Sequence, residues 1–308
     1  MDSIEFPENI SGVSKNMHDA YFKEVFSNIE NTTDLLQSAL PELSKNIDFE
    51  SLELQSTSYI DKDLKSEFSD LVYNCNFENE KIEVTLIFEH KSSPDIYVEL
   101  QLLSYIQSTW NLNLKQNKKV LPVISIIFHH GSKKLNLTIF DRLKQLPESI
   151  RKYQPLFMVE TIDTATLTSE DIMSIFKTAK LKFVMVVMKH IQSSPEKVLD
   201  ELKRFGNIVI ALKDTPNGKN LIQTTAIYIG KKPGTKMETI IEKFAEIEKE
   251  VGQIAKSAWE IEFEKGIEKG IEKNVIKMLE FGIEISMIEN ITGLSIKRIN
   301  ELQKQFKI

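Results

Sequence analysis

A short apolar segment that ends in three ionisable residues constrains the fold of this chain more than any other feature. Residues 82–88 have the apolar pattern of a strand, and Glu89, His90 and Lys91 follow directly, where a turn would normally end the strand. Because side chains alternate along a strand, Glu89 and Lys91 are predicted to share one face and His90 to point to the other. The chain must therefore place an acid and an amine side by side at one end of a sheet.

The segment that precedes this strand is predicted to pair with it as an antiparallel hairpin. Residues 78–81 have the composition of a tight turn, and folding the chain back about Asn79 and Glu80 pairs residues whose numbers sum to 159 (79 plus 80). In this register Asp70 lies opposite Glu89, at the roughly 5 Å spacing of opposed side chains. Two carboxylates that close repel each other unless positive charge lies between them, which a divalent cation and Lys91 would supply. The alternative is that Asp70 lies in a turn and that Glu89 and Lys91 form a surface ion pair.

The composition is that of a folded, acidic protein. The 308 residues are 41% hydrophobic and 27% charged, with a formal net charge of -6, so any contact with DNA must come from a local basic patch. The single Cys75 excludes an internal disulfide and a cysteine-based zinc site. The N-terminus lacks a signal-peptide pattern, and no apolar run approaches the roughly 18 residues of a membrane span. We therefore expect a cytoplasmic protein without a membrane partner.

Helical and strand-like patterns alternate up to about residue 230. Helical spacing occurs in residues 18–26, 35–40, 98–110, 133–155, 169–190 and 196–204, with a cap or short break at residues 31–33. Strand-like patterns occur in residues 52–60, 120–128 and 156–162. The continuous apolar run 120–128 is typical of a strand buried on both faces. These patterns predict an α/β fold, in which helices cover the faces of a sheet that begins with three antiparallel strands.

The C-terminal part is predicted to be helical throughout. Apolar residues from Ile240 to Ile261 are spaced alternately four and three residues apart, as in a coiled coil between two copies of a chain. The same spacing fits a helix packed on the chain's own globular domain. Residues 275–302 have the pattern of short helices, with a helix-turn-helix-like step at Thr292-Gly293. The predicted divisions are a loose N-terminal arm, residues 1–15, a globular domain, residues 16–230, and a helical region, residues 236–308.

Several motifs, taken together and in order, resemble those of one protein family. They are His18-Asp19 with Phe22-Lys23 and Phe26, Leu40-Pro41, Ser69-Asp70-Leu71-Val72-Tyr73, Phe88-Glu89-His90-Lys91-Ser92, Gln101-Leu102-Leu103-Ser104-Tyr105, Trp110, Pro122-Val123 and His130-Gly131. Between about residues 18 and 190 the chain resembles the Rpn family of recombination-promoting nucleases, also called YhgA-like transposases, within the PD-(D/E)XK nuclease superfamily. The resemblance implies a restriction-endonuclease-like core, a mixed sheet flanked by helices, here followed by an all-α C-terminal extension.

The resemblance also implies roles for individual residues. Asp70 and Glu89 correspond to the two metal-binding carboxylates, and Lys91 corresponds to the lysine of the same motif. Gln101 matches a supporting polar position on the following helix, and the N-terminal motif adds two further candidates for a supporting role, Asp19 and Lys23. The chain departs from the family type in its acidic charge and in the thin basic patch at residues 116–119.

These residue types fit the hydrolysis of a phosphodiester with a bound Mg²⁺ or Mn²⁺. Such a cation activates water, neutralises phosphate oxygens and needs only one or two protein carboxylates, while Lys91 could orient or deprotonate the water or stabilise the transition state. His129 and His130 point to opposite faces of their strand, which favours a structural role over metal binding.

The expected function is that of a metal-dependent DNA endonuclease that promotes recombination or mobile-element movement. DNA is the expected partner, and a homo-oligomer is expected to form through residues 240–261. The alternative is a non-catalytic DNA-binding or oligomerisation protein on a decayed nuclease scaffold.

Overall fold

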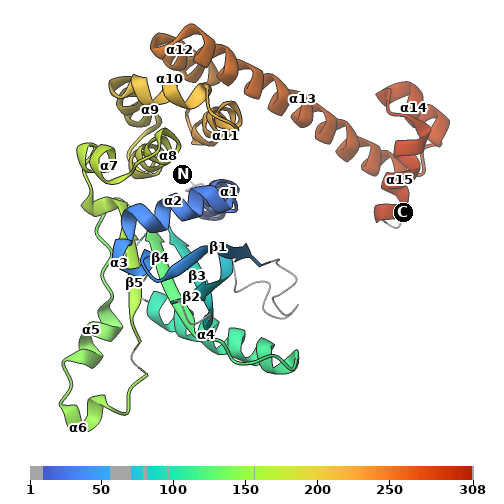
Figure 1. Cartoon of the computed structure of the whole chain (residues 1–308). Helices are drawn as coiled ribbons and strands as arrows, with labels where there is room; N and C mark the ends of the chain where they lie inside the picture. Colours follow the sequence, from blue (N-terminus) through green and yellow to red (C-terminus); the bar gives the residue numbers. More distant parts are fainter. Residues whose placement is uncertain are drawn as a thin grey trace, which may run out of the picture.

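A five-stranded mixed sheet forms the centre of the molecule (Figure 1). The computed structural model describes residues 10–55, 71–78, 82–93, 95, 97–155 and 157–306. In spatial order the strands are β1 (Ile47–Leu54), β2 (Leu71–Phe77), β3 (Ile82–Lys91), β4 (Val123–His129) and β5 (Val159–Asp163). The first three strands pair antiparallel, whereas β3, β4 and β5 run parallel. This arrangement confirms the predicted α/β fold with a mixed sheet flanked by helices.

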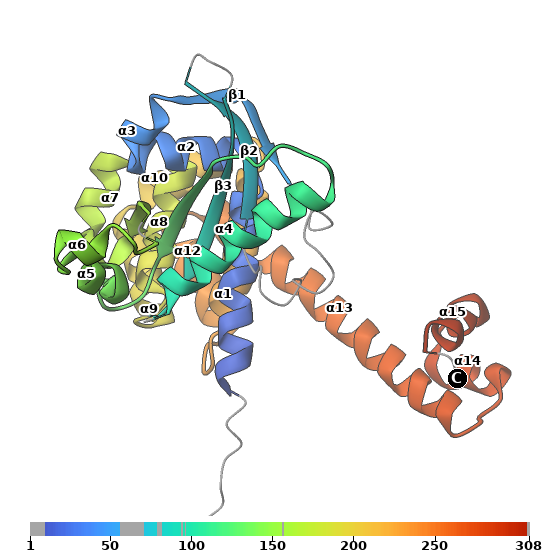
Figure 2. The same cartoon turned by 90° about the horizontal axis from the view of Figure 1, so that it is seen from below.

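Helices cover both faces of the sheet (Figures 1 and 2). On one face α4 (Val98–Lys115) packs through Leu102 and Tyr105 on Ile87 and Ile127. The other face carries a larger core that includes Phe22, Phe88 and Phe128. The helices of that second face include α1 (Ile10–Phe26), α2 (Ile29–Ala39) and α8 (Ala179–His190), and the short α3 (Pro41–Ser44) leads from α2 to β1.

Between β4 and β5 the chain leaves the sheet and forms two short helices, α5 (Thr138–Lys144) and α6 (Glu148–Arg151). They lie on the same side of the sheet as α4 (Figures 1 and 2). Leu135, just before α5, is buried with Ile87 and Ile127. The connection predicted at residues 133–155 as mostly helical thus contains helix, but only in 11 of its 23 residues (7 plus 4).

The helix predicted over residues 169–190 is instead two helices. These are α7 (Ser169–Ile175) and α8, separated at Phe176, whose backbone is extended with φ -84° and ψ 140°. The side chain of Thr178 accepts a hydrogen bond from the backbone N–H of Leu181 and so caps α8. A local capping residue therefore divides a segment whose apolar periodicity is continuous.

The heptad-patterned segment is also two helices, α12 (Met237–Ile247) and α13 (Lys249–Glu280). The backbone is extended at Glu248, and the two helices then approach so closely that a Cβ added at Gly252 would lie 2.6 Å from the Cβ of Ala245. Ile240 and Phe244 are buried in the same core as Phe22. The seam thus packs largely on the chain's own helices, and residues on both sides of the predicted boundary at 230–235 share one core.

The remaining helices complete the helical layer and a small terminal unit. They are α9 (Pro195–Arg204), α10 (Gly206–Lys213), α11 (Gly218–Gly230), α14 (Ile285–Thr292) and α15 (Ile296–Phe306). The C-terminal half of α13 extends away from the sheet and packs against α14 and α15 around Val275, Ile288 and Ile299 (Figure 1). Gly293 follows α14 with φ 71°, a left-handed conformation that suits glycine. None of the helices in the described ranges combines the length and apolar character needed to cross a bilayer.

Candidate active site

The pairing of β2 with β3 has the register that the sequence predicts. Leu71 pairs with Phe88 and Tyr73 with Leu86, so that the numbers of paired residues sum to 159 (71 plus 88). Asp70, the first predicted metal ligand, lies outside the described residues. The observed pairing ends one position before Glu89.

Lys91 is the centre of a buried polar network on the α4 side of β3. Its ammonium lies 2.7 Å from Oε1 of Glu89 and 2.9 Å from Oδ2 of Asp95, and it donates a hydrogen bond of 2.7 Å to Oε1 of Gln101. Burial would lower the pKa of Lys91, but the carboxylates of Glu89 and Asp95 outweigh burial and raise it. The side chain is therefore a fixed cation at neutral pH.

The carboxylate of Glu89 is only half satisfied by this network. The residue is 1% exposed, and its Oε2 has no hydrogen-bond partner among the residues that the structure describes. A buried carboxylate oxygen in this state is costly unless a cation, a water or another donor reaches it. A divalent cation bound at Oε2 would meet this requirement, although Glu89 has no neighbouring set of three acidic, histidine or cysteine ligands within the described part of the chain.

Gln101 is held in place by the helix that follows the strand. Its Nε2 donates to the hydroxyl of Tyr105, one turn further along α4, and Tyr105 is itself buried against Ile87. Asp95 is fixed by a second bond, in which its Oδ1 accepts from the backbone N–H of Tyr97 at 2.9 Å. The partners of Lys91 are thus positioned by α4 and by the turn before it.

His90 points to the opposite face of the sheet, as alternation predicts. Its Nδ1 lies 2.7 Å from Oδ1 of Asp19, and its ring stacks between Phe22 and His130. Burial lowers the pKa of His90 more than the Asp19 carboxylate raises it. Asp19 therefore supports His90 on the α1 side of the sheet, away from Lys91.

Lys23, the other residue of the N-terminal motif, lies one turn after Asp19 on α1. It is half-buried, and its ammonium makes no hydrogen bond or ion pair with the described residues. The structure thus brings Glu89, Lys91 and Gln101 together and keeps Asp19 on the other face.

A second buried pair lies beside Lys91 and was not predicted. His129 is the β4 residue that pairs with Lys91, and its Nδ1 lies 2.7 Å from Oδ1 of Asp163 at the end of β5. Burial would raise the pKa of Asp163, but His129 and the backbone N–H groups of Leu135 and Ala165 lower it. The carboxylate fixes the imidazole with its Nδ1–H toward Asp163. Only the His129-His130-Gly131 motif signalled this pair in the sequence.

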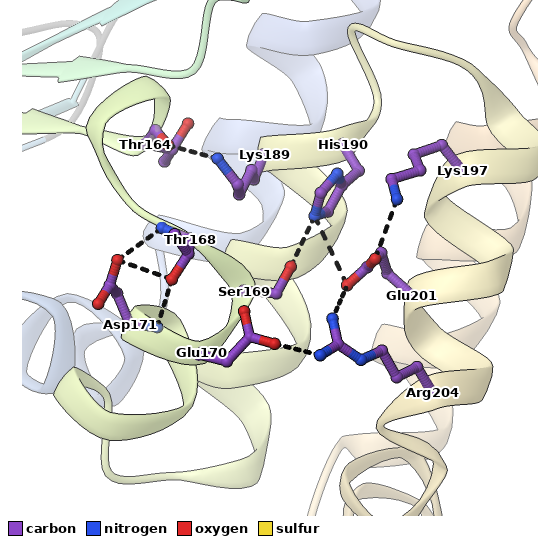
Figure 3. Close-up of polar contacts among 10 residues, drawn as sticks. All are labelled: Thr164, Thr168, Ser169, Glu170, Asp171, Lys189, His190, Lys197, Glu201 and Arg204. Carbon is purple, nitrogen blue, oxygen red and sulfur yellow. Dashed lines mark hydrogen bonds and ion pairs between the residues drawn. The ribbon is translucent and has the colours of Figure 1, made fainter.

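A third polar cluster joins α7, α8 and α9 (Figure 3). Ser169 Oγ lies 2.8 Å from His190 Nε2, and the same nitrogen lies 3.9 Å from Oε2 of Glu201. In a Ser-His-acid triad the hydroxyl and the acid bind different ring nitrogens, so this geometry does not activate Ser169. Glu201 also binds Lys197 and Arg204, and the cluster ties the three helices together.

The sheet is mixed, has helices on both faces and carries Glu-His-Lys at the end of its middle strand. These features define an α/β core of the restriction-endonuclease type. Residues 16–219 match the family described as "Putative transposase, YhgA-like", and the chain belongs to this family. The resemblance to the Rpn nucleases is thereby confirmed.

Relatives of known name lie within the same nuclease family. Recombination-promoting nuclease RpnC of Escherichia coli K12 is 27% identical over 180 residues, which cover 57% of this chain and 58% of RpnC. Recombination-promoting nuclease RpnD of Escherichia coli O157:H7 is 25% identical over 181 residues, which cover 57% of this chain and 68% of RpnD. The inactive recombination-promoting nuclease-like protein RpnE of K12 is 24% identical over 292 residues, which cover 90% of this chain and 94% of RpnE. No solved structure matches the chain.

Proposed function

We propose that the chain is a metal-dependent DNA endonuclease that hydrolyses phosphodiester bonds in the cytoplasm and promotes recombination or mobile-element movement. The observation that carries this proposal is the buried carboxylate of Glu89, whose Oε2 lacks a partner among the described residues while its Oε1 holds Lys91 at 2.7 Å. The names of RpnC and RpnD support the nuclease role.

In this proposal Asp70 and Glu89 hold Mg²⁺ or Mn²⁺. The observed register, continued by one residue beyond Leu71 and Phe88, would set Asp70 opposite Glu89. The cation, when bound, supplies an activated water and neutralises charge on the phosphate. Oε2 of Glu89 is the atom left for this contact, because Oε1 is already occupied by Lys91.

Lys91 has a role of its own in the proposed reaction. Its pKa is raised by Glu89 and Asp95, so it is protonated and acts as a fixed positive charge rather than as a base. A cation held in place before the reaction stabilises negative charge that develops on the phosphate. Gln101, locked by Tyr105, keeps the ammonium on the Glu89 side of β3.

The proposal is tested by nicking of supercoiled plasmid DNA in Mg²⁺ or Mn²⁺. Asp70→Asn and Glu89→Gln are each expected to abolish cleavage, since each removes one proposed metal ligand. Glu264→Gln, an exposed position on α13, is the matched control and should cleave like wild type. Full activity of either site variant would disprove the site assignment.

The match to RpnE favours a second candidate function. RpnE is named inactive and aligns over 90% of this chain, so a decayed nuclease that binds DNA or self-associates through its C-terminal helices is the alternative. DNA binding without cleavage in any divalent metal, lost on deletion of residues 262–308, would favour it. That deletion spares the part of α13 that is buried in the main core.

Self-association through residues 240–261 remains part of the proposal. Within this stretch most seam residues are buried on the chain's own helices, whereas Trp259 and Ile261 are 38% and 47% exposed. Ile261 is the seam residue that a second copy could reach, and the exposed Trp259 lies two positions before it. Sedimentation of wild type and Ile261→Glu tests this, and a wild-type monomer at micromolar concentration would contradict it.

A further inference from the structure

The segment between β4 and β5, residues 133–153, carries a local excess of positive charge and is called the basic arm below. It contains six cationic residues and two acidic ones, a net charge of +4, in a chain whose net charge is -6. The cationic residues are Lys133, Lys134, Arg142, Lys144, Arg151 and Lys152, and the acidic ones are Asp141 and Glu148. The rest of the chain is correspondingly more acidic and would repel a polyanion.

Most of these cations are not used to hold the fold together. Lys133, Lys134, Arg142 and Lys144 are exposed, and their side chains form no ion pair with the described residues. Of the arm's cations, Arg151 is the one that pairs with an acid in the described part of the chain, namely Glu148. Cations that do hold the fold together are paired, as at the largely buried Lys213, which lies 2.9 Å from Glu248 and 2.7 Å from Glu250. The four exposed cations of the basic arm are therefore free to contact a ligand.

The tip of the basic arm adds an aromatic surface. Tyr153 is 76% exposed, and the ammonium of Lys152 lies 5.1 Å from the centre of its ring. Exposed aromatic rings beside cations are typical of surfaces that contact nucleic acid, where the ring stacks on bases and the cation binds phosphate.

The root of the basic arm is fixed next to the candidate active site. Oε1 of Glu99 on α4 accepts hydrogen bonds from the backbone N–H groups of Ile139 and Phe140, at the start of α5. Gln101, which binds Lys91, lies two residues further along the same helix, a rise of about 3 Å. The basic arm and the Glu89 network thus both contact the first turns of α4. The helices α4, α5 and α6 lie on one side of the sheet (Figure 2).

We propose that the basic arm is the surface that binds the phosphate backbone of DNA beside Glu89 and Lys91. This inference rests on the proposed nuclease function and identifies where its substrate is held. An acidic protein binds DNA only through a local patch, and each phosphate neutralised by such a patch releases condensed counterions. The basic arm supplies that patch from a root held by Glu99 on α4, the helix whose Gln101 binds Lys91.

The test is DNA binding by the full-length protein in EDTA, where a metal-dependent nuclease does not cleave. The probe is a fluorescein-labelled DNA duplex of about 30 base pairs, followed by anisotropy between about 50 and 200 mM KCl. The arm variant combines Arg142→Gln, Lys144→Gln and Lys152→Gln. The matched control removes three exposed lysines of the distant α13, Lys265→Gln, Lys269→Gln and Lys273→Gln.

We expect the arm variant to bind at least about tenfold more weakly and its log-log salt slope to fall by about 2.7, since three phosphate contacts are lost. The control should bind within about twofold of wild type. Circular dichroism establishes that both variants are folded. Wild-type affinity and salt slope in the arm variant would overturn the inference, as would an equal or larger loss in the control.

Cleavage assays separate this inference from the proposed function. If the wild type binds DNA through the basic arm but cleaves with no divalent metal, the nuclease function fails and the inference stands. If the wild type cleaves while the arm variant binds and cleaves equally well, the nuclease function stands and the inference fails.

Discussion

Replacing Lys91 with methionine tests whether the charges at the end of β3 are balanced as the structure indicates. Methionine keeps an unbranched side chain but removes the cation that lies 2.7 Å from Glu89 and 2.9 Å from Asp95. Glu89 is 1% exposed, so its carboxylate would lose its counter-charge while still buried. Removal of one partner from a buried ion pair costs about 3 to 5 kcal/mol, and the partial exposure of Asp95 favours the lower end, about 3 kcal/mol.

The assay is urea unfolding followed by circular dichroism in EDTA, with Lys119→Met as the matched control. Lys119 is exposed and forms no ion pair with the described residues, so its replacement should change stability by less than about 0.5 kcal/mol. Added Mg²⁺ should restore part of the loss in Lys91→Met, because a cation that binds only the folded state stabilises it. Equal stability of Lys91→Met and wild type would refute the reasoning about buried charge.

Three further predictions concern other parts of the molecule. The pKa of His18 is lowered to about 4 by burial and by the charges of Lys232 and His90. Between about pH 4 and 6.5 the unfolded state therefore binds more protons than the folded state, so the free energy of unfolding falls as the pH falls through that window. The expected loss is about 2 kcal/mol at pH 5 relative to pH 7.5, and His18→Gln should lose less in unfolding measured at both values. Gly131→Ala should destabilise by about 1 to 3 kcal/mol in urea, because a Cβ there would lie 2.4 Å from Nε2 of His129; unchanged stability would contradict this packing. On α13, Gly270→Ala should stabilise the protein by up to about 1 kcal/mol, because no atom lies within 4 Å of the added Cβ, whereas Gly252→Ala should destabilise it. A shift of the melting temperature in the same direction for both variants would contradict the packing of α13 on α12.

The register of the β2–β3 hairpin could be predicted because it depends on local information. A short turn fixes which residues face each other, and alternation then decides which face each side chain takes. The observed pair of Leu71 with Phe88 and the separation of His90 from Lys91 both follow from these two rules.

The pair of His129 and Asp163 could not be predicted in the same way. β4 and β5 are parallel, so their register depends on a long connection rather than on a turn. The sequence places 33 residues between the two partners, from 130 to 162, and no local pattern joins them. Asp95 was missed for a similar reason, since its contact with Lys91 depends on how the chain turns before α4.

The heptad seam shows a different limit. Spacing by four and three residues specifies an apolar stripe but not the surface that covers it. The structure covers Ile240 and Phe244 with the chain's own helices after a break at Glu248 that the apolar pattern does not reveal. The break before α13 is the single extended residue Glu248, and the break before α8 spans residues 176–178; periodicity alone locates neither.

In the proposed site, Glu89 and Asp70 together hold a divalent cation beside Lys91. It is tested most directly by a crystal structure of the protein grown with Mn²⁺, in which anomalous scattering locates the metal. We expect one Mn²⁺ within reach of Oε2 of Glu89 and the carboxylate of Asp70, with Lys91 still in contact with Gln101. A structure at saturating Mn²⁺ with no metal at Glu89, or with Asp70 directed away from it, would contradict the account.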